Sequence, residues 1–249
     1  MSTTVFKKPE GLTDKRMHYC PGCGHGIVHR IIAECISEMN ETDNTIICAP
    51  VGCGVFVPKY LTYDSLHCAH GRAPATATGI KRVYPDKMVI TYQGDGDLAS
   101  IGMAEIVHVA ARGEKVTTIF INNGIYGMTG GQMAPTTLPG MKATTSQAGR
   151  TAEKNGNPIR VSEMLSTLTG PVYIERVAVN TPANVVKTKK AIKKALQLQK
   201  EGKGFTMVEI MSNCPTNWGL NAVKSMEYVG EKMIPYYPLG VYKDVKEEE

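Results

Sequence analysis

Apolar side chains follow two spacings along the chain, one typical of helices and the other of buried strands. In residues 27–39 the apolar positions lie three and four apart, which predicts a helix with one buried face. Short apolar runs that are rich in β-branched residues predict buried strands. These runs are residues 45–49, 87–92, 115–121, 171–177 and 205–211.

Helix signals fall between the predicted strands. Residues 98–111 fit a helix that ends before Gly113. Thr181 is a suitable N-cap with Pro182 at the first helical position, and this helix is expected to run to about Lys200. Strands that alternate with helices predict an α/β fold, in which a mostly parallel sheet carries helices on both faces.

No repeat or low-complexity linker divides the sequence, so we expect residues 1–249 to form a single domain. Within it we expect an N-terminal cysteine loop at about residues 15–55 and a C-terminal extension at about residues 212–249.

The composition is that of a globular protein and disfavours several other classes. Hydrophobic residues make up 42% of the chain and charged residues 20%, which argues against disorder and coiled coil. A formal charge of +5 and an aromatic content of 6% are too low to indicate nucleic-acid binding. There is no apolar run of about 18 residues and no apolar signal core near the start, so we expect no membrane span and a cytoplasmic protein.

Glycine and polar residues directly follow two of the predicted strands. Gly94-Asp95-Gly96 occupies a strand-to-helix turn, and Asn123 follows the next strand. Ligands of parallel sheets bind at such strand ends, where glycine lets the backbone approach and a helix N-terminus attracts phosphate. Asp95 and Asn123 offer the oxygen ligands that Mg²⁺ prefers beside a diphosphate. The pattern therefore predicts a magnesium-diphosphate site.

Two other interpretations compete with this one. Gly-Asp-Gly and Asn-Asn-Gly are common loop sequences, so ordinary turn chemistry stays open. A Rossmann dinucleotide site is disfavoured, because Ala99 stands where the last glycine of its fingerprint is expected and no acidic residue ends the next strand.

The sequence around these strand ends resembles a known family. Gly-Asp-Gly followed by Asn-Asn is similar to the thiamine diphosphate motif, and residues 93–99 with residues 122–132 resemble the β subunit of 2-oxoacid:ferredoxin oxidoreductases. The resemblance extends from Cys20 to about Tyr237. It implies a thiamine diphosphate-binding fold.

The resemblance also implies the roles of particular residues. Mg²⁺ is expected on Asp95, Asn123 and the carbonyl of Ile125, and residues 126–132 are expected to wrap the diphosphate. The cofactor-binding residues expected on this basis are Gly94, Asp95, Gly96, Asp97, Asn123, Tyr126, Gly127, Met128 and Thr129. His70 and Arg72 belong to the family pattern and, with Cys53, are the expected catalytic residues.

Seven cysteines in a chain expected in the cytoplasm indicate metal chemistry, redox chemistry or buried thiols rather than a disulfide framework. Cys20 and Cys23 form a CxxC in a Pro-Gly turn, which suits one metal site. Cys53 and Cys214, each beside glycine or proline, are the best candidates for two further ligands. The resemblance assigns these four to a [4Fe–4S] cluster, whereas spacing alone leaves zinc or a redox dithiol open.

The remaining cysteines fit other environments. Cys35 lies on the apolar stripe of the first helix and Cys48 in an apolar strand, so both are predicted to be core residues. Cys68, beside His67 and His70, is a weaker candidate for a second ligand cluster.

The resemblance implies CoA-dependent oxidative decarboxylation of a 2-oxoacid, with electrons passed through the cluster to ferredoxin. The sequence before residue 94 is too short for a second α/β domain, so an alpha subunit is expected to supply the glutamate that activates the aminopyrimidine. Gamma and ferredoxin-like delta subunits are also expected. Two alternatives stay open: an electron-transfer or zinc-binding module without thiamine, and a subunit of a non-redox thiamine lyase.

The residues after Cys53 bear on the substrate. Residues 55–57 are Val-Phe-Val, and an apolar pocket near the thiazolium would suit a branched-chain 2-oxoacid. A dicarboxylate would need a cation, for which Lys59 and Arg72 are the nearest candidates. We therefore expect 2-ketoisovalerate to be preferred, followed by 2-oxoglutarate and then pyruvate.

Six lysines crowd the predicted helix at residues 182–200. A solvated helix face is the favoured interpretation, and electrostatic steering of an acidic ferredoxin is the alternative.

Overall fold

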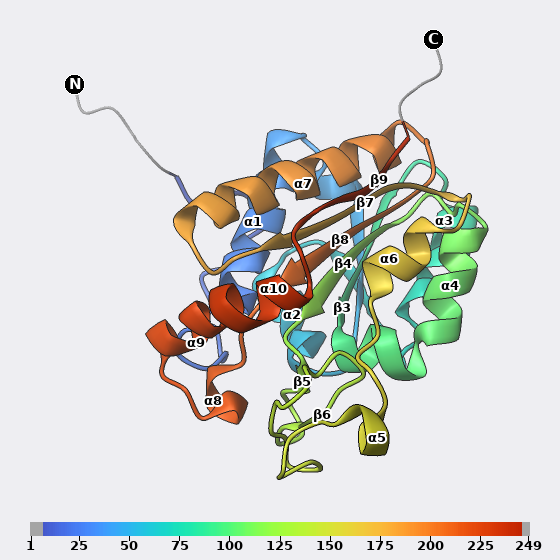
Figure 1. Ribbon diagram of the computed structural model, residues 1–249. Coiled ribbons are helices and arrows are strands. Elements are labelled where there is room, and N and C mark those ends of the chain that lie inside the picture. The colour runs from blue at the N-terminus through green and yellow to red at the C-terminus, as the bar shows by residue number, and fades with distance from the viewer. Residues whose placement is uncertain (1–6, 246–249) are drawn as a thin grey trace.

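A seven-stranded sheet with the strand order β2-β1-β3-β4-β8-β7-β9 forms the centre of the computed structural model, which describes residues 7–245 (Figure 1). Six of the strands are parallel, and β9 runs antiparallel to β7. The strands are β1 (Thr45–Ala49), β2 (Asp64–His67), β3 (Met88–Gly94), β4 (Thr117–Asn122), β7 (Pro171–Ala178), β8 (Phe205–Met211) and β9 (Gly240–Asp244). The five strands predicted from the apolar runs are confirmed, as is the mostly parallel sheet.

Helices cover both faces of the sheet, as predicted. On one face α1 (His25–Glu38) packs beside α7 (Pro182–Lys200), and on the other lie α3 (Ala73–Val83), α4 (Met103–Ala111) and α6 (Val161–Ser166) (Figure 1). Each interface buries its own apolar cluster. The Thr181 hydroxyl accepts a hydrogen bond from the Asn184 amide at 3.2 Å, which confirms the predicted N-cap of α7.

The helix predicted at residues 98–111 is divided into two parts. A π-helical turn, η3 (Asp97–Ile101), precedes α4, and Gly102 joins them. An added Cβ at Gly102 would stand 2.5 Å from the carbonyl oxygen of Asp97 and 2.9 Å from that of Gly71. The break therefore accommodates the close packing of the loop at Gly71 against the start of the helix.

Two edge strands and the helix α3 are among the elements that were not predicted. All four residues of β2 are exposed, so this strand lacks the apolar alternation of a half-buried strand. The strand β9 belongs to the C-terminal extension and pairs with β7 with an irregular register. The helix α3 begins directly after Arg72 and carries Thr and Gly among its alanines, which weakens its helix signal.

Shorter elements complete the chain. Near its start lie η1 (Thr42–Asn44), η2 (Cys53–Phe56) and α2 (Val57–Tyr60). The range predicted as the cysteine loop, about residues 15–55, also contains α1 and β1. The C-terminal extension contains α8 (Pro215–Trp218), α9 (Ala222–Tyr228), η4 (Val229–Met233) and α10 (Ile234–Tyr236) before β9, and its last residues, 246–249, lie outside the described part. No helix among residues 7–245 is long and apolar enough to cross a membrane.

The lysines of α7 are largely paired with acidic side chains. Lys189 and Lys193 contact Glu38 at 2.6 and 2.8 Å, Lys194 contacts Asp244 at 2.6 Å, and Lys200 contacts Glu41 at 2.6 Å. These ion pairs reduce the positive field of the helix, which favours the solvated face over ferredoxin steering.

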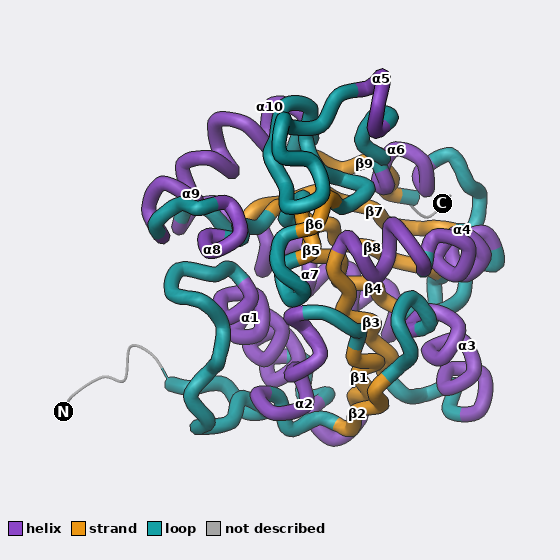
Figure 2. Tube along the Cα trace, turned by 90° about the horizontal axis from the view of Figure 1, so that it is seen from below, coloured by secondary structure: helices purple, strands orange, loops and turns teal. Residues whose placement is uncertain are grey.

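The carboxyl ends of the parallel strands meet at one edge of the sheet, which Figure 2 views directly. Over this edge lies a short hairpin of β5 (Ile125–Tyr126) and β6 (Gln132–Met133), followed by the irregular chain that contains α5 (Ala152–Asn155). The helices α8 and α9 lie beside the same edge (Figure 2). The predicted strand-end residues therefore share one site.

Candidate active site

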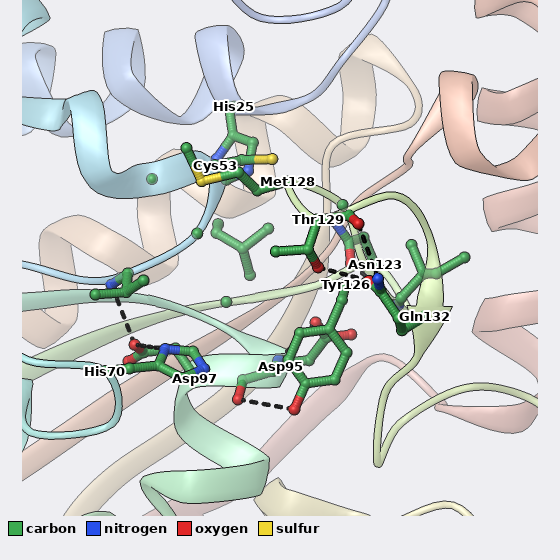
Figure 3. A pocket seen from close by; sticks show the side chains of 18 residues that line it. His25, Cys53, His70, Asp95, Asp97, Asn123, Tyr126, Met128, Thr129 and Gln132 are labelled. Atoms are coloured by element: carbon green, nitrogen blue, oxygen red, sulfur yellow. Dashed lines mark hydrogen bonds and ion pairs between the residues drawn. The ribbon is translucent and has the colours of Figure 1, made fainter. Parts of the chain in front are cut away.

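A cavity of about 420 Å³ opens at the carboxyl edge of the sheet (Figure 3). All nine residues predicted to bind the cofactor line it, together with His70, Cys53 and Ile125. The residues that line it and were not predicted are His25, Val51, Gly52, Gly54 and Ile121, whereas Gln132 belongs to the loop that was expected to wrap the diphosphate. Segments that lie far apart in the sequence thus converge on one space.

Asp95 and Asn123 lie at adjacent strand ends, as their positions after β3 and β4 predict. Asp95 is 2% exposed; one carboxylate oxygen accepts a hydrogen bond from the Gly96 amide at 2.9 Å, and the other accepts from the Thr136 hydroxyl at 2.6 Å. Backbone amides of the turn after Asn123 also donate to Asp95. Burial nevertheless raises the pKa of the Asp95 carboxyl to about 6, because the hydrogen bonds offset only part of the desolvation.

The loop at residues 126–132 is closed by its own hydrogen bonds. The Gly131 amide donates to the Tyr126 carbonyl at 2.9 Å, and the Gln132 side chain donates to the Thr129 carbonyl at 2.8 Å. Tyr126 packs over Gly96 so closely that an added Cβ there would stand 2.2 Å from its ring. Glycine at position 96 is therefore required by the packing of this loop.

Asp97 supports the cavity wall through its neighbours. Its carboxylate accepts from the amides of Val51 and Gly71 at 3.1 and 3.0 Å and from the Gln93 side chain at 2.6 Å, and it lies 2.8 Å from Nδ1 of His70 (Figure 3). These contacts orient the His70 ring from its Nδ1 side.

Arg72 is not brought into the cavity. Its guanidinium forms an ion pair with Glu105 on α4, and it is absent from the cavity lining. Of the three residues expected to be catalytic, the structure brings His70 and Cys53 together with the strand ends, and places Arg72 outside.

The apolar residues expected near the substrate also lie elsewhere. The chain turns helical after Cys53, so Val57 points into the core at 1% exposure and Phe56 packs edge-on against His18 with ring centroids 4.2 Å apart. None of residues 55–57 lines the cavity, and their predicted place beside the substrate is wrong. Val51 and Met128 supply apolar surface there instead.

His25 is a cavity residue for which no role was predicted. It begins α1 directly after the CxxC loop, and its Nδ1 forms a 2.5 Å hydrogen bond with the Tyr92 hydroxyl. Burial lowers the pKa of His25 to about 4, so the ring is neutral at pH 7. The only feature of the sequence that could have indicated a place for His25 in the site is its position two residues after Cys23.

Four of the cysteines gather beside this cavity. Cys20 and Cys23 lie in one turn, in which the Cys23 amide donates to the Cys20 carbonyl at 3.0 Å. Asn213 fixes this turn beside Cys214, because its side chain accepts from the Gly24 amide at 3.0 Å and donates to the Gly22 carbonyl at 2.9 Å.

The four thiols interact electrostatically, as a compact group does. Burial raises the pKa of Cys23 to about 12 and that of Cys53 to about 11, and the neighbouring thiolates add to both shifts. Cys214 and Cys20 both contribute to the shift at each of these residues. We call Cys20, Cys23, Cys53 and Cys214 the cysteine quartet.

The quartet and the loop at 126–132 meet at Gly127. An added Cβ there would stand 3.2 Å from the sulfur of Cys53 and 3.4 Å from that of Cys214. The Asn217 side chain reinforces the junction, because it donates to the Gly127 carbonyl at 2.7 Å and lies 3.3 Å from the Cys214 sulfur. Gly127 thus touches the quartet from the cofactor loop, and Cys53 belongs to both the quartet and the cavity lining.

The other cysteines are buried, as predicted for Cys35 and Cys48, both 0% exposed. Cys68 forms a side-chain hydrogen bond with Cys48. Among residues 7–245 no group of three or more His, Cys, Asp or Glu side chains could hold a metal ion as the side chains stand. Cys68 contacts Cys48 and His70 contacts Asp97, so the structure gives no support to the suggested ligand cluster of Cys68 with His67 and His70.

Comparison with known proteins extends these observations. Residues 51–210 match the family described as thiamine pyrophosphate enzyme, C-terminal TPP binding domain. The chain is 45% identical over 240 residues to the ketoisovalerate oxidoreductase subunit VorA of Methanothermobacter thermautotrophicus, which covers 96% of this chain and 50% of that protein. It is 43% identical over 202 residues to the 2-oxoglutarate synthase subunit KorB of Methanocaldococcus jannaschii, covering 81% of this chain and 70% of that protein.

A solved structure is also similar. It is a 2-oxoglutarate:ferredoxin oxidoreductase from Magnetococcus marinus with 2-oxoglutarate, coenzyme A and succinyl-CoA bound. The TM-score is 0.77 and the identity 26%, and the match covers 96% of this chain and 84% of that chain. The chain spans about half the length of the ketoisovalerate oxidoreductase subunits that it matches.

Proposed function

The chain belongs to the thiamine pyrophosphate enzymes, among the subunits of 2-oxoacid oxidoreductases, and from this premise we propose that it is the thiamine diphosphate-binding subunit of a 2-oxoacid:ferredoxin oxidoreductase. The proposed reaction is the CoA-dependent oxidative decarboxylation of a 2-oxoacid. The observation that carries the proposal is the cavity at the carboxyl edge, in which a buried carboxylate and a side-chain amide end adjacent strands.

The residues around the cavity fit a magnesium-bound diphosphate. Asp95 and Asn123 offer side-chain oxygens and Ile125 a backbone carbonyl, which are the donors that Mg²⁺ prefers. A Cβ at Gly94 would meet no atom within 4 Å, although its backbone angles allow any residue. The absence of a side chain at Gly94 therefore keeps open a space that a cofactor would fill. Bound there, thiamine diphosphate supplies a carbanion that attacks the 2-oxo carbon and then holds the charge left by loss of CO₂.

The cysteine quartet fits a [4Fe–4S] cluster better than a zinc ion. A single zinc ion draws its thiolates to bonds of about 2.3 Å, whereas a cubane cluster sits between thiolates that are spaced more widely. The four thiols are near enough to affect one another's pKa, and as the side chains stand no three of them could hold a single metal ion. Such a cluster accepts electrons one at a time, and Gly127 is where the quartet touches the cofactor loop.

The side chains of the cavity suggest distinct tasks. His70 is oriented by Asp97 at Nδ1 and so can hold or release a proton at Nε2. His25 is neutral and buried, and its hydrogen bond to Tyr92 fixes its ring at the wall of the cavity. Arg72 remains a candidate for substrate or CoA contact only if its ion pair with Glu105 opens.

The lining of the cavity supports 2-ketoisovalerate as the preferred substrate. Within residues 7–245, no lysine or arginine lines the cavity, so this chain offers no cation to the second carboxylate of 2-oxoglutarate. Val51 and Met128 suit a branched apolar chain instead. The relative named as a ketoisovalerate oxidoreductase subunit supports this preference. We propose 2-oxoglutarate as the second substrate and pyruvate as the third.

We place the rest of the machinery on partner subunits. No glutamate lines the described cavity, so the group that activates the aminopyrimidine is assigned to an alpha subunit. Gamma and ferredoxin-like delta subunits, with ferredoxin as the acceptor, complete the proposed complex. The relatives are themselves named as subunits.

The complex is tested by dye reduction after anaerobic purification. We expect reduction that requires both CoA and a 2-oxoacid, with the highest kcat/KM for 2-ketoisovalerate. The chain alone is expected to be inactive, because no glutamate lines its described cavity. Two controls are the omission of CoA and the replacement of the 2-oxoacid by a carboxylic acid that lacks the 2-oxo group.

Other results would favour the alternatives. Substrate turnover without dye reduction would identify a non-redox thiamine lyase. A complex that contains iron or zinc but binds no thiamine diphosphate would identify an electron-transfer or zinc-binding module. A higher kcat/KM for 2-oxoglutarate would overturn the substrate order and leave the reaction class standing.

A further inference from the structure

A chain of hydrogen bonds connects Asp95 to the C-terminal extension. The Thr136 hydroxyl donates to Asp95 at 2.6 Å, and the Thr136 carbonyl accepts from the Tyr237 hydroxyl at 2.8 Å. Thr136 and Tyr237 are both 0% exposed. Tyr237 follows α10, more than 100 residues after Thr136 in the sequence. A distant segment thus holds the residue that contacts the proposed metal ligand.

A second chain of hydrogen bonds reaches the turn that carries Asn123. The Asn122 side chain accepts from the Gly124 amide at 3.2 Å and donates to Glu209 at 2.8 Å. Glu209 in turn accepts from Arg176 at 2.9 Å, and Arg176 donates to the Pro238 carbonyl at 3.2 Å. The Asp95 side chain and the turn that carries Asn123 are therefore both connected to the same C-terminal segment.

The two chains meet at a buried charge. The Arg176 guanidinium lies 5.2 Å from the centroid of the Tyr237 ring, and both Arg176 and Glu209 are 0% exposed. Burial of an ion pair is costly and adds little net stability compared with apolar residues of the same size. Because the ends of this network contact Asp95 and the turn that carries Asn123, the network can hold the proposed metal ligands in place, which a simple core contact does not do.

We propose that Thr136 and Tyr237 are positioning residues for the metal-diphosphate site. Thr136 holds one carboxylate oxygen of Asp95, so the carboxylate cannot rotate away from the cavity, and Tyr237 fixes the backbone of Thr136. The inference rests on the proposed function, because the group that Asp95 would bind is Mg²⁺ with thiamine diphosphate. Partners of this kind orient metal ligands and tune their affinity.

The test compares variants that differ by one hydroxyl in the purified complex. Thr136→Val keeps the shape and removes the donor, whereas Thr136→Ser keeps the donor. Calorimetry gives the Mg²⁺ concentration for half-maximal thiamine diphosphate binding. We expect Thr136→Val to raise this concentration about 10–100-fold and Thr136→Ser to stay near the wild type. Tyr237→Phe is expected to raise it less, because it acts through the Thr136 backbone.

Thermal unfolding without ligand separates positioning from a purely structural role. Tyr236→Phe is the matched control, and it is expected to leave the Mg²⁺ requirement unchanged.

A lower melting temperature with an unchanged Mg²⁺ requirement in Thr136→Val and Tyr237→Phe would overturn the inference. A serine variant that binds as weakly as the valine variant would also overturn it. If Thr136→Val does not fold, Tyr237→Phe decides. Wild-type complex that binds no thiamine diphosphate would overturn the proposed function and the inference together, whereas normal binding in both variants would overturn the inference alone.

Discussion

Replacement of Asp95 by asparagine is expected to lower 2-oxoacid turnover on the order of 10³-fold. The carboxylate is the only negatively charged donor among the three proposed magnesium ligands, and its loss removes more than an outer partner, for which about 10–100-fold is typical. The affinity for thiamine diphosphate in the presence of Mg²⁺ is expected to fall in parallel. Calorimetric titration and steady-state kinetics of the Asp95→Asn complex measure the two effects.

The fold is not expected to suffer from this substitution. Burial raises the pKa of Asp95, so its charged form disfavours the unliganded fold at pH 7, and a neutral amide of the same size relieves that cost. The melting temperature without ligand should therefore stay equal or rise. Asn123→Asp is the matched variant, which retains an oxygen ligand and should keep binding within about tenfold. Full activity of Asp95→Asn would rule out its role as a ligand.

Replacement of Cys214 by serine is expected to remove the cluster from the quartet and to lower substrate-dependent dye reduction by at least about 10²-fold. A [4Fe–4S] cluster needs four thiolates, and the remaining three cannot complete the site. Iron and acid-labile sulfide should each fall by about four atoms per chain in the Cys214→Ser complex. Thiamine diphosphate binding should remain, because the cavity is lined by other residues.

Cys35→Ser is the matched control for this result. Cys35 is as well buried as any cysteine of the chain but lies in the core between α1 and the sheet, away from the quartet. Its iron and sulfide contents should equal those of the wild type. Equal iron in Cys214→Ser and wild type, or zinc in place of iron in both, would contradict the assignment of the quartet.

The sheet and the strand-end residues were predictable because both depend on local sequence. The central strands β3 and β4 are short, fully buried runs rich in apolar and β-branched residues, and polar or glycine residues follow them. Parallel strands end at one edge, which places Asp95 beside Asn123 without further information. The edge strand β2 was missed for the opposite reason, since all its residues are exposed.

The assembly of the quartet could not be derived from spacing. Cys214 lies far along the chain from Cys23, and the two loops are joined by hydrogen bonds from Asn213 to Gly22 and Gly24. Such contacts between distant loops leave no periodic pattern in the sequence. The family resemblance supplied this set of four, and the shared contact of Cys53 and Cys214 with Gly127 agrees with it.

Residues 55–57 were expected near the substrate but do not line the cavity, because the chain turns helical from Cys53 onward. Sequence proximity to Cys53 suggested proximity to the substrate, but the turns η2 and α2 direct Val57 into the core. The supporting network of Thr136, Tyr237 and Arg176 was also missed, since its members come from three separate segments. Only the folded chain brings them behind the strand ends.

Anomalous diffraction from crystals grown with Mn²⁺ and thiamine diphosphate locates the metal directly. Mn²⁺ takes the same oxygen ligands as Mg²⁺, so its anomalous signal reports the site. We expect one manganese peak bonded to Asp95, Asn123 and the Ile125 carbonyl, with the diphosphate beside Gly94. A manganese-bound cofactor at any other place, or a peak that touches neither side chain, would contradict the assignment of the cavity.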